Sequence, residues 1–211
     1  MILIDTLTLR VEVDVRPVFI YGRYIKNSRE IPQTRWPCRS CRGRKGGCEA
    51  CESSGLQYLD SVQDLIGRPF VAGMGALDTA FHGMGREDID VRCLGGGRPF
   101  VLEVKSPRSR SPELSDYESI ISSTCGGRVE VNSLRFSDRK EVARIKQTRS
   151  EKTYTISFST KETIDKEKAT SLILSLSGVV VEQQTPKRVS HRRADKLSLI
   201  HISEPTRPTP I

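Results

Sequence analysis

Two closely spaced cysteine pairs constrain what this chain can fold into. Cys38 and Cys41 form the first pair, Cys48 and Cys51 form the second, and six residues separate them. Four thiolates at this spacing satisfy the tetrahedral preference of Zn²⁺, and the intervening glycines permit tight turns. The spacing therefore predicts a closed structural zinc site within residues 38–55, here called the cysteine module. Disulfide bonds and free thiols are the alternatives.

The composition predicts a folded, basic, intracellular protein. The chain has 211 residues, which suits one domain with room for an appendage, and its 36% hydrophobic content supports a core. A formal net charge of +8 favours a polyanionic partner, such as nucleic acid or a membrane surface. No apolar run approaches the length of a membrane span, and the N-terminus does not resemble a signal peptide. We therefore expect a cytoplasmic or nuclear protein whose cysteines are metal ligands or free thiols.

Hydrophobic periodicity predicts strands and helices in alternation. Strands are expected at 7–15 (half-buried), 18–21 (ending at Gly22), 98–105, 129–136, 154–158 and 179–181. Helices are expected after Asp60 or Ser61, after Ser111, from Asp138 to Ile145, and along a core stripe at 169–176. The segment 23–36 is expected to be a surface loop. This order indicates an α+β fold with a mixed, mostly antiparallel sheet and helices on one side.

The segment 81–107 carries the densest group of charged side chains that could take part in chemistry. Its acids and bases are Arg86, Glu87, Asp88, Asp90 and Arg92, with glycines on both sides. Charged residues are rarely buried unless they are paired, and a glycine turn lets the backbone approach a ligand. The pattern favours a reactive or binding site, and a solvated charged turn is the alternative. We expect Asp90 to pair with an arginine rather than to react.

Several strings taken together resemble the archaeal and eukaryotic family of tRNA pseudouridine synthases that modifies the TΨC arm. They lie in family order from about Arg16 to Arg193, and the combination is far more specific than any one string. In chain order they are RPVFIYGRY (16–24), SR (28–29), QTRW (33–36), GREDIDVR (85–92), GRPF (97–100), KTY (152–154), and TPKRV followed by HRR (185–193). The cysteine module also resembles that of the archaeal members.

The resemblance implies a pseudouridine synthase catalytic domain over residues 1–196, an isomerase that converts uridine to pseudouridine at tRNA position 54, 55 or both. It implies that Asp88 is the catalytic aspartate and that Tyr154 packs against the target base. Arg86 would hold the flipped nucleotide and pair with Asp88. The reaction needs no metal or organic cofactor, so the zinc would be structural, and we expect a monomer that binds the TΨC arm and no membrane. From the residues alone, Tyr154 could instead be a strand residue facing the core.

Two basic segments are candidate RNA contacts. The first, 185–196, includes Arg188, Arg192 and Arg193. The second consists of Arg39, Arg42, Arg44 and Lys45 in the cysteine module. Charges of this kind suit contacts with phosphates that position RNA without reading its sequence. The alternatives are a charged edge strand for the first segment and a solubilising surface for the second.

The chain departs from the family at both ends. Family members usually carry an N-terminal accessory RNA-binding domain, which we expect to be missing here, and the family's C-terminal strand motif is not found. The segment 197–211 contains the string SLIHISEPTRP, which looks like a translated sequencing-library adapter. We interpret this segment as a non-native tail and the chain as a truncated fragment whose own activity is left open.

Two other functions fit parts of the pattern. Asp88 or Asp90, followed by Glu103-x-Lys105 on a strand, would suit a metal-dependent nuclease, in which the acids hold Mg²⁺ and the lysine steadies the attacking water. A non-catalytic zinc-containing RNA-binding module would explain the cysteines and the charge without the acidic segment. Dependence on Mg²⁺ separates a nuclease from a synthase, and the substitution Asp88→Asn separates a synthase from a pure binder.

Overall fold

The computed structural model describes residues 2–148, 150–155, 157, 163, 165–183 and 198–201. The chain divides into two compact units, Met1–Glu151 and Lys152–Ile211, and each is described by itself. Within the described ranges, no helix has the length and apolar character needed to cross a membrane.

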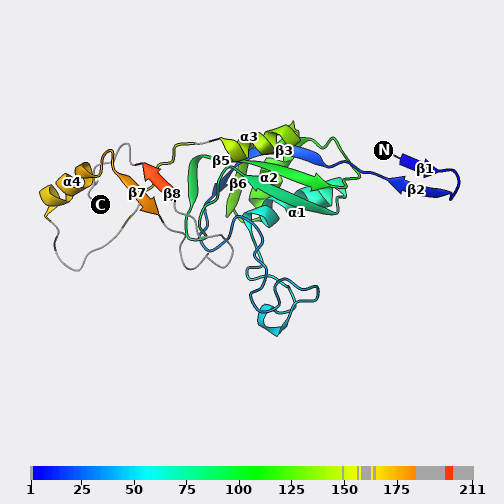
Figure 1. The fold of residues 1–211 in the computed structure, drawn as a ribbon, viewed down its shortest axis with the longest axis horizontal. Coiled ribbons are helices and arrows are strands. Elements are labelled where there is room, and N and C mark those ends of the chain that lie inside the picture. The colour runs from blue at the N-terminus through cyan, green and yellow to red at the C-terminus, as the bar shows by residue number, and fades with distance from the viewer. Residues whose placement is uncertain are drawn as a thin grey trace. The chain divides into compact units, whose positions relative to one another are not determined.

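The first unit is built on a four-stranded sheet with the order β4-β5-β3-β6 (Figure 1). Its strands are β3 (Val18–Lys26), β4 (Asp78–Gly83), β5 (Cys93–Lys105) and β6 (Val129–Ser137). Each described pairing in this sheet is antiparallel. The predicted α+β class and antiparallel character are therefore confirmed, and the described strands contain no parallel pair of the kind a mixed sheet would have.

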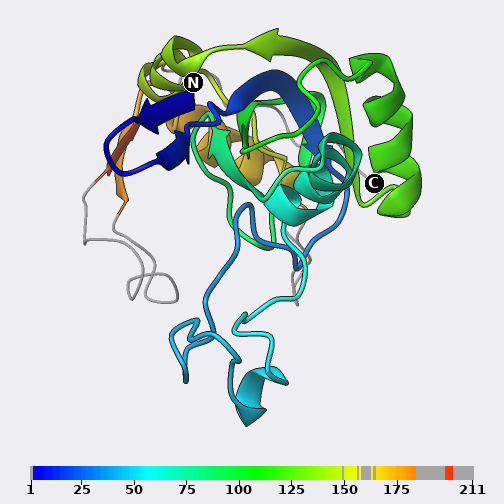
Figure 2. The same cartoon turned by 90° about the vertical axis from the view of Figure 1, so that its right-hand side faces the viewer.

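Helices cover both faces of the sheet, and this corrects the expectation of helices on one side (Figure 2). Helices α1 (Val62–Met74) and α2 (Leu114–Thr124) pack on the face that carries the larger core cluster. Helix α3 (Arg139–Gln147) packs on the opposite face, where Val142 and Ile145 meet Val101 of β5. Alternate residues of a strand point to opposite faces, so β5 supplies apolar side chains to both clusters.

The helix starts follow local capping chemistry. Ser61 Oγ accepts a hydrogen bond from the amide of Asp64 at 3.1 Å, and Asp138 Oδ1 accepts one from the amide of Glu141 at 3.0 Å. Both predicted starts are confirmed. Helix α2 begins at Leu114 with Glu113 as its N-cap, a little later than the start predicted after Ser111.

Strand β3 is longer than predicted, because Gly22 lies inside it rather than at its end. A Cβ atom on Gly22 would lie 2.6 Å from Leu134 Cδ2 and 3.0 Å from Phe100 Cε1, so the missing side chain is what lets these neighbours pack. The strand continues to Lys26. The first residues of the predicted surface loop 23–36 are therefore part of the sheet, and Ile31 and Gln33 are also buried.

The strand predicted at 7–15 forms only at Arg10–Val13, and its predicted half-burial is wrong. The chain forms an exposed hairpin of β1 (Ile2–Asp5) and β2 (Arg10–Val13), and Leu7 is 94% exposed. Asp5 closes the turn, since its carboxylate accepts hydrogen bonds from the amide of Leu7 at 2.9 Å and from Thr8 Oγ1 at 2.6 Å. An Asp that bonds its own following backbone favours a turn over a continuing strand.

The second unit contains α4 (Lys166–Ser175) and a pair of strands, β7 (Val180–Gln183) and β8 (Ser198–His201). Helix α4 buries none of its residues, so the interpretation of the stripe 169–176 as core is wrong. Strand β8 falls within the segment 197–211, whose non-native origin stays a prediction.

Candidate active site

The acidic residues lie on the connection between β4 and β5, residues 84–92, here called the GRED loop. Asp88 is half-buried, Asp90 is exposed, and Glu87 is buried. The amide of Met84 donates to Pro99 O at 2.9 Å, and the amide of Val91 donates to Asp88 O at 3.2 Å. The loop is therefore a folded turn with an ordered path.

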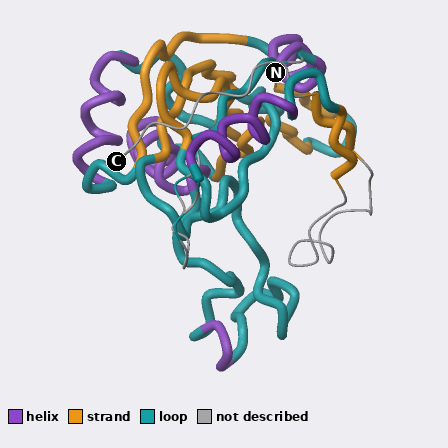
Figure 3. The backbone as a smooth tube through the Cα atoms, turned by 90° about the vertical axis from the view of Figure 1, so that its left-hand side faces the viewer, coloured by secondary structure: helices purple, strands orange, loops and turns teal. Residues whose placement is uncertain are grey.

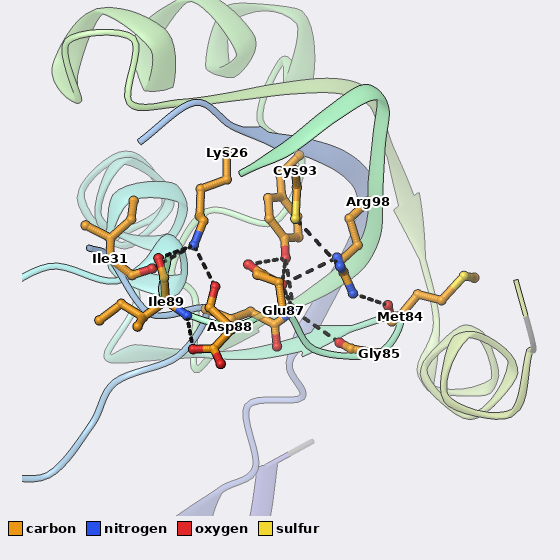
Figure 4. Close-up of polar contacts among 11 residues, drawn as sticks. Lys26, Ile31, Met84, Gly85, Glu87, Asp88, Ile89, Cys93 and Arg98 are labelled. Atoms are coloured by element: carbon orange, nitrogen blue, oxygen red, sulfur yellow. Dashed lines mark hydrogen bonds and ion pairs between the residues drawn. The ribbon is translucent and has the colours of Figure 1, made fainter. Parts of the chain in front are cut away.

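Glu87 is the anchor of the loop (Figure 4). Its side chain is 1% exposed and accepts hydrogen bonds from Tyr24 Oη at 2.7 Å and Gln33 Nε2 at 3.0 Å. The guanidinium of Arg98 forms an ion pair with it, with Nε 3.4 Å from Oε2. A buried carboxylate is tolerated when it is paired and hydrogen-bonded, and Glu87 meets both conditions. The alternative of a solvated charged turn is therefore wrong for this residue.

The ionisation of this network is fixed by its surroundings. Burial, followed by the negative charge of Glu87, raises the pKa of Tyr24 well above its usual value, so the phenol remains a donor. Burial opposes the charge of Arg98, but the nearby Tyr24 and Glu87 raise its pKa overall. Arg98 also donates to Met84 O at 3.1 Å, which ties the start of the GRED loop to β5.

Asp88 follows the anchor directly. Its Oδ1 accepts a hydrogen bond from the amide of Ile89 at 2.6 Å, and its main-chain oxygen accepts one from Lys26 Nζ at 3.2 Å. Figure 4 shows the carboxylate turned away from the lysine. Arg29 donates to the main-chain oxygen of Asp90, so an arginine does contact this residue through its backbone. Sequence reasoning missed Lys26, because a single lysine among polar residues gives no sign that it is buried.

Arg86 lies beside an aromatic ring. Its guanidinium carbon is 5.8 Å from the centre of the Trp36 ring, a cation–π distance, and Trp36 packs edge-on against Tyr58. Trp36 lies two residues before Cys38, where the cysteine module begins, so Arg86 joins the GRED loop to the base of that module. The pairing of Arg86 with Asp88 stays a prediction.

The other predicted RNA-binding residues, Tyr154, Arg188, Arg192 and Arg193, belong to the second unit, whereas the basic residues of the cysteine module belong to the first. Tyr154 is 65% exposed and lies in no helix or strand, so the core alternative for this side chain is wrong. Its contact with the target base stays a prediction. Arg188, Arg192 and Arg193 lie outside the described residues, and so do Ile156 and Phe158 of the predicted strand at 154–158.

The four cysteines of the module come together as predicted (Figure 3 shows their segment as a loop with one short helix). Their sulfur atoms all lie within 4.8 Å of one another, with Cys38–Cys48 at 3.8 Å, Cys41–Cys51 at 3.9 Å and Cys48–Cys51 at 3.7 Å. Tetrahedral zinc with Zn–S bonds of about 2.3 Å requires sulfurs about 3.8 Å apart. A disulfide requires about 2.0 Å, and all four cysteines are free. The residues therefore fit a zinc ion and exclude the disulfide alternative.

Backbone groups prepare this site for a cation. Burial opposes the ionisation of Cys51, but hydrogen bonds from the amides of Cys48 and Gly55 lower its pKa to about 6. Burial and the neighbouring thiols raise the pKa of Cys48 to about 11. Gly47 adopts a φ of +61°, and a Cβ there would lie 2.4 Å from the Ser53 carbonyl carbon, so only glycine fits this turn.

The structure separates the acids that a nuclease would need. In the described part of the chain, the four cysteines form the one cluster suited to a metal ion. Glu103 instead pairs with His82 at 3.0 Å, and its position on β5 is paired with Phe19 near the start of β3. The main-chain oxygen of Asp88 contacts Lys26, at the other end of β3. About seven residues of strand, roughly 23 Å, lie between these points. The metal-dependent nuclease alternative therefore has no assembled site.

Comparison with known proteins identifies the family. A model of the Pus10 C-terminal family matches residues 19–203. The chain is 50% identical over 196 residues to the tRNA pseudouridine synthase Pus10 of Methanothrix thermoacetophila, covering 92% of this chain and 43% of the relative. For the proteins of the same name from Methanothermobacter marburgensis and Archaeoglobus fulgidus, the identities are 47% over 188 residues and 45% over 196. The match to the Methanothermobacter marburgensis protein covers 89% of this chain and 46% of that relative. The match to the Archaeoglobus fulgidus protein covers 93% of this chain and 54% of that relative.

The chain spans about half the length of the curated relatives it matches. The family match nevertheless includes the sheet from β3 onward, the cysteine module and the GRED loop. The chain belongs to the Pus10 C-terminal family.

Proposed function

We propose that this chain carries the catalytic centre of a tRNA pseudouridine synthase that isomerises uridine at positions 54 and 55 of the TΨC arm, with Asp88 as the catalytic carboxylate. The observation that carries the proposal is the position of Asp88. It is half-buried, it directly follows the buried Glu87, and its main chain is held by Lys26. A carboxylate held in this way can be presented to a substrate with little reorganisation.

The reaction suits a carboxylate. The bond between C1′ and N1 breaks, the base turns, and C5 bonds to C1′, while the proton on C5 leaves and N1 gains one. Breaking the glycosidic bond builds positive charge at C1′, and a carboxylate beside that carbon stabilises the charge or attacks it, as carboxylates do in glycosidases. The chemistry needs no metal, so the zinc held by Cys38, Cys41, Cys48 and Cys51 would maintain the fold of the module.

The target nucleotide must leave the base stack to reach Asp88. Unstacking costs a few kcal/mol, and stacking on an aromatic side chain returns about 1–3 kcal/mol. Tyr154 would supply this contact, and Arg86 would grip the flipped nucleotide from its place beside Trp36. Arg188, Arg192 and Arg193 would follow the RNA backbone, and the enzyme would act inside the cell as a monomer on tRNA.

The test is Asp88→Asn in the full-length protein that contains this chain. The readout is pseudouridine in an unmodified tRNA transcript, measured by chromatography and mass spectrometry of its nucleosides. We expect the single-turnover rate to fall by at least about 1,000-fold, since the missing charge acts at the reacting carbon, while tRNA affinity stays within about threefold.

A matched control is Asp90→Asn, because Asp90 lies on the same loop and is exposed. This variant should keep most of the activity. If Asp88→Asn forms pseudouridine at the wild-type rate, the proposal is wrong. A protein that binds tRNA but forms no pseudouridine before any substitution would instead support the non-catalytic RNA-binding alternative.

A further inference from the structure

Lys26 is a fully buried cation at the end of β3, next to the GRED loop. It is 0% exposed, and burial lowers its pKa, although the negative charge of Glu87 opposes that shift. Removing an ammonium group from water costs several kcal/mol unless its donors are satisfied. Packing alone does not require such a residue, because Val18 fills the buried position at the other end of the same strand with an apolar side chain.

Three main-chain oxygens satisfy the ammonium group. Lys26 Nζ donates to Ile31 O at 3.0 Å, to Ile89 O at 3.1 Å and to Asp88 O at 3.2 Å. A protonated lysine has three N–H donors and no acceptor, so the number of partners matches the charged form. Figure 4 shows the side chain reaching these oxygens from the strand.

These contacts join two segments that are far apart in the sequence. One is the connection after β3, residues 27–31, and the other is the GRED loop at Asp88 and Ile89. A second bond supports the same junction, since the amide of Glu30 donates to Ile89 O at 3.0 Å. The anchor Glu87 fixes the loop on one side of Asp88, and Lys26 fixes the main chain of Asp88 itself. The loop is therefore held on both sides of the carboxylate.

We propose that Lys26 is a positioning residue that sets the location of the Asp88 carboxylate by holding its main-chain oxygen. This inference rests on the proposed function of Asp88. Lys26 contacts no reacting atom; it acts through the backbone of the loop. Displacing a reacting group by about 1 Å can lower a rate by about 100-fold, so a main-chain tether of this kind bears directly on the chemical step.

The experiment compares Lys26→Met and Lys26→Gln with the wild type in the full-length protein. Methionine has nearly the length of lysine and no donor, whereas glutamine keeps two neutral N–H donors. We expect single-turnover rates at saturating enzyme to fall in the order wild type, Lys26→Gln, Lys26→Met, with Lys26→Met slower by about 10- to 100-fold. The tRNA dissociation constant should change by less than about threefold, since Lys26 is buried.

Hydrogen exchange distinguishes positioning from a general loss of stability. In both variants, amides of 28–31 and 86–91 should exchange at least about tenfold faster, while those of α1 keep their protection. Val142→Ala is the matched control, because it truncates a buried side chain on the opposite face of the sheet. At a temperature where it is folded, it should react at the wild-type rate.

Wild-type rates in both folded Lys26 variants would overturn the inference, and so would a uniform rise in exchange across the sheet. If Lys26→Met does not fold, Lys26→Gln decides alone, since a wild-type rate in that variant contradicts the tether. Asp88→Asn keeps the two proposals apart. If Asp88→Asn is active, the proposed function is wrong. If Asp88→Asn is inactive but the Lys26 variants are fully active, only the proposed role of Lys26 is wrong.

Discussion

The GRED loop and the cysteine module are both irregular segments held by polar groups, but the sources of their order differ. The GRED loop is held by side chains from three places in the sequence: Tyr24 and Lys26 of β3, Gln33 of the following connection, and Arg98 of β5. The cysteine module is held by four thiols within residues 38–51. One segment depends on the folded sheet, and the other depends on its own turns and on four thiols that fit a zinc ion.

This difference predicts where each region is vulnerable. Removing Glu87 or Arg98 leaves the opposite charge buried in the sheet, so the cost falls on the whole first unit. Removing one of the four thiols should disrupt a segment that contributes little to the sheet. The two regions should therefore respond differently to substitution, to pH and to chelation.

The largest effect is expected from Glu87→Ala. The substitution leaves the guanidinium of Arg98, whose side chain is 15% exposed, without its carboxylate. Breaking a buried ion pair in this way costs about 3–5 kcal/mol of unfolding free energy. Urea denaturation, followed by circular dichroism, measures the change. The exposed Glu52→Ala is the control and should stay within about 0.5 kcal/mol of the wild type. A loss below about 1 kcal/mol for Glu87→Ala would show that the loop does not depend on this anchor.

A second effect is the pH dependence of zinc binding. The pKa of Cys48 is about 11 in the metal-free site and that of Cys51 is about 6, so at neutral pH zinc must displace the Cys48 proton. The apparent affinity should fall at least about tenfold for each pH unit below 8, and more steeply below about pH 6, where Cys51 also binds a proton. Competition with a chromophoric chelator across this range measures the slope. An affinity that does not change between pH 8 and pH 6 would contradict the thiolate site.

The network around Glu87 should show no comparable change over the same range. Burial and Glu87 raise the pKa of Tyr24, and the pKa of Arg98 is also raised, so both groups stay protonated well above pH 8. The contribution of these two groups to the stability of the sheet should therefore be nearly constant over this range, while zinc affinity changes. If the stability of the sheet and the zinc affinity change with pH in parallel, the two regions are energetically one unit.

The same contrast explains what could be predicted from the sequence. The cysteine spacing specified its site, because ligand number and turn geometry are local properties. The caps at Ser61 and Asp138 were predicted for the same reason. Asp88 was selected as a candidate through its motif, and the structure places it on a folded loop beside β5.

The network that holds Asp88 could not be predicted, because its members meet only after the sheet has formed. Glu87 lies 63 positions from Tyr24, and no periodic pattern connects them. The burial of Lys26 was also missed, since Gly22 was taken as the end of a strand that continues past it. At the N-terminus the apolar alternation was real, but the local bonds of Asp5 turned the chain back and left Leu7 exposed.

The smallest expected effect gives the sharpest separation of the two regions. Cys41→Ser should abolish stoichiometric zinc, measured by elemental mass spectrometry, and expose the amides of 38–55 to exchange. The sheet should lose less than about 1 kcal/mol of unfolding free energy, because the base of the module is closed independently of the metal. Arg35 pairs with Asp64 at 2.6 Å and with Asp78 at 2.9 Å, and the amide of Gln57 donates to Trp36 O at 2.8 Å.

The control is Cys125→Ala, which removes a buried thiol outside the module and should leave the zinc content unchanged. If chelation or Cys41→Ser also releases the amides of 86–91, the contact between Arg86 and Trp36 transmits the loss of zinc to the GRED loop, and the separation proposed here is wrong.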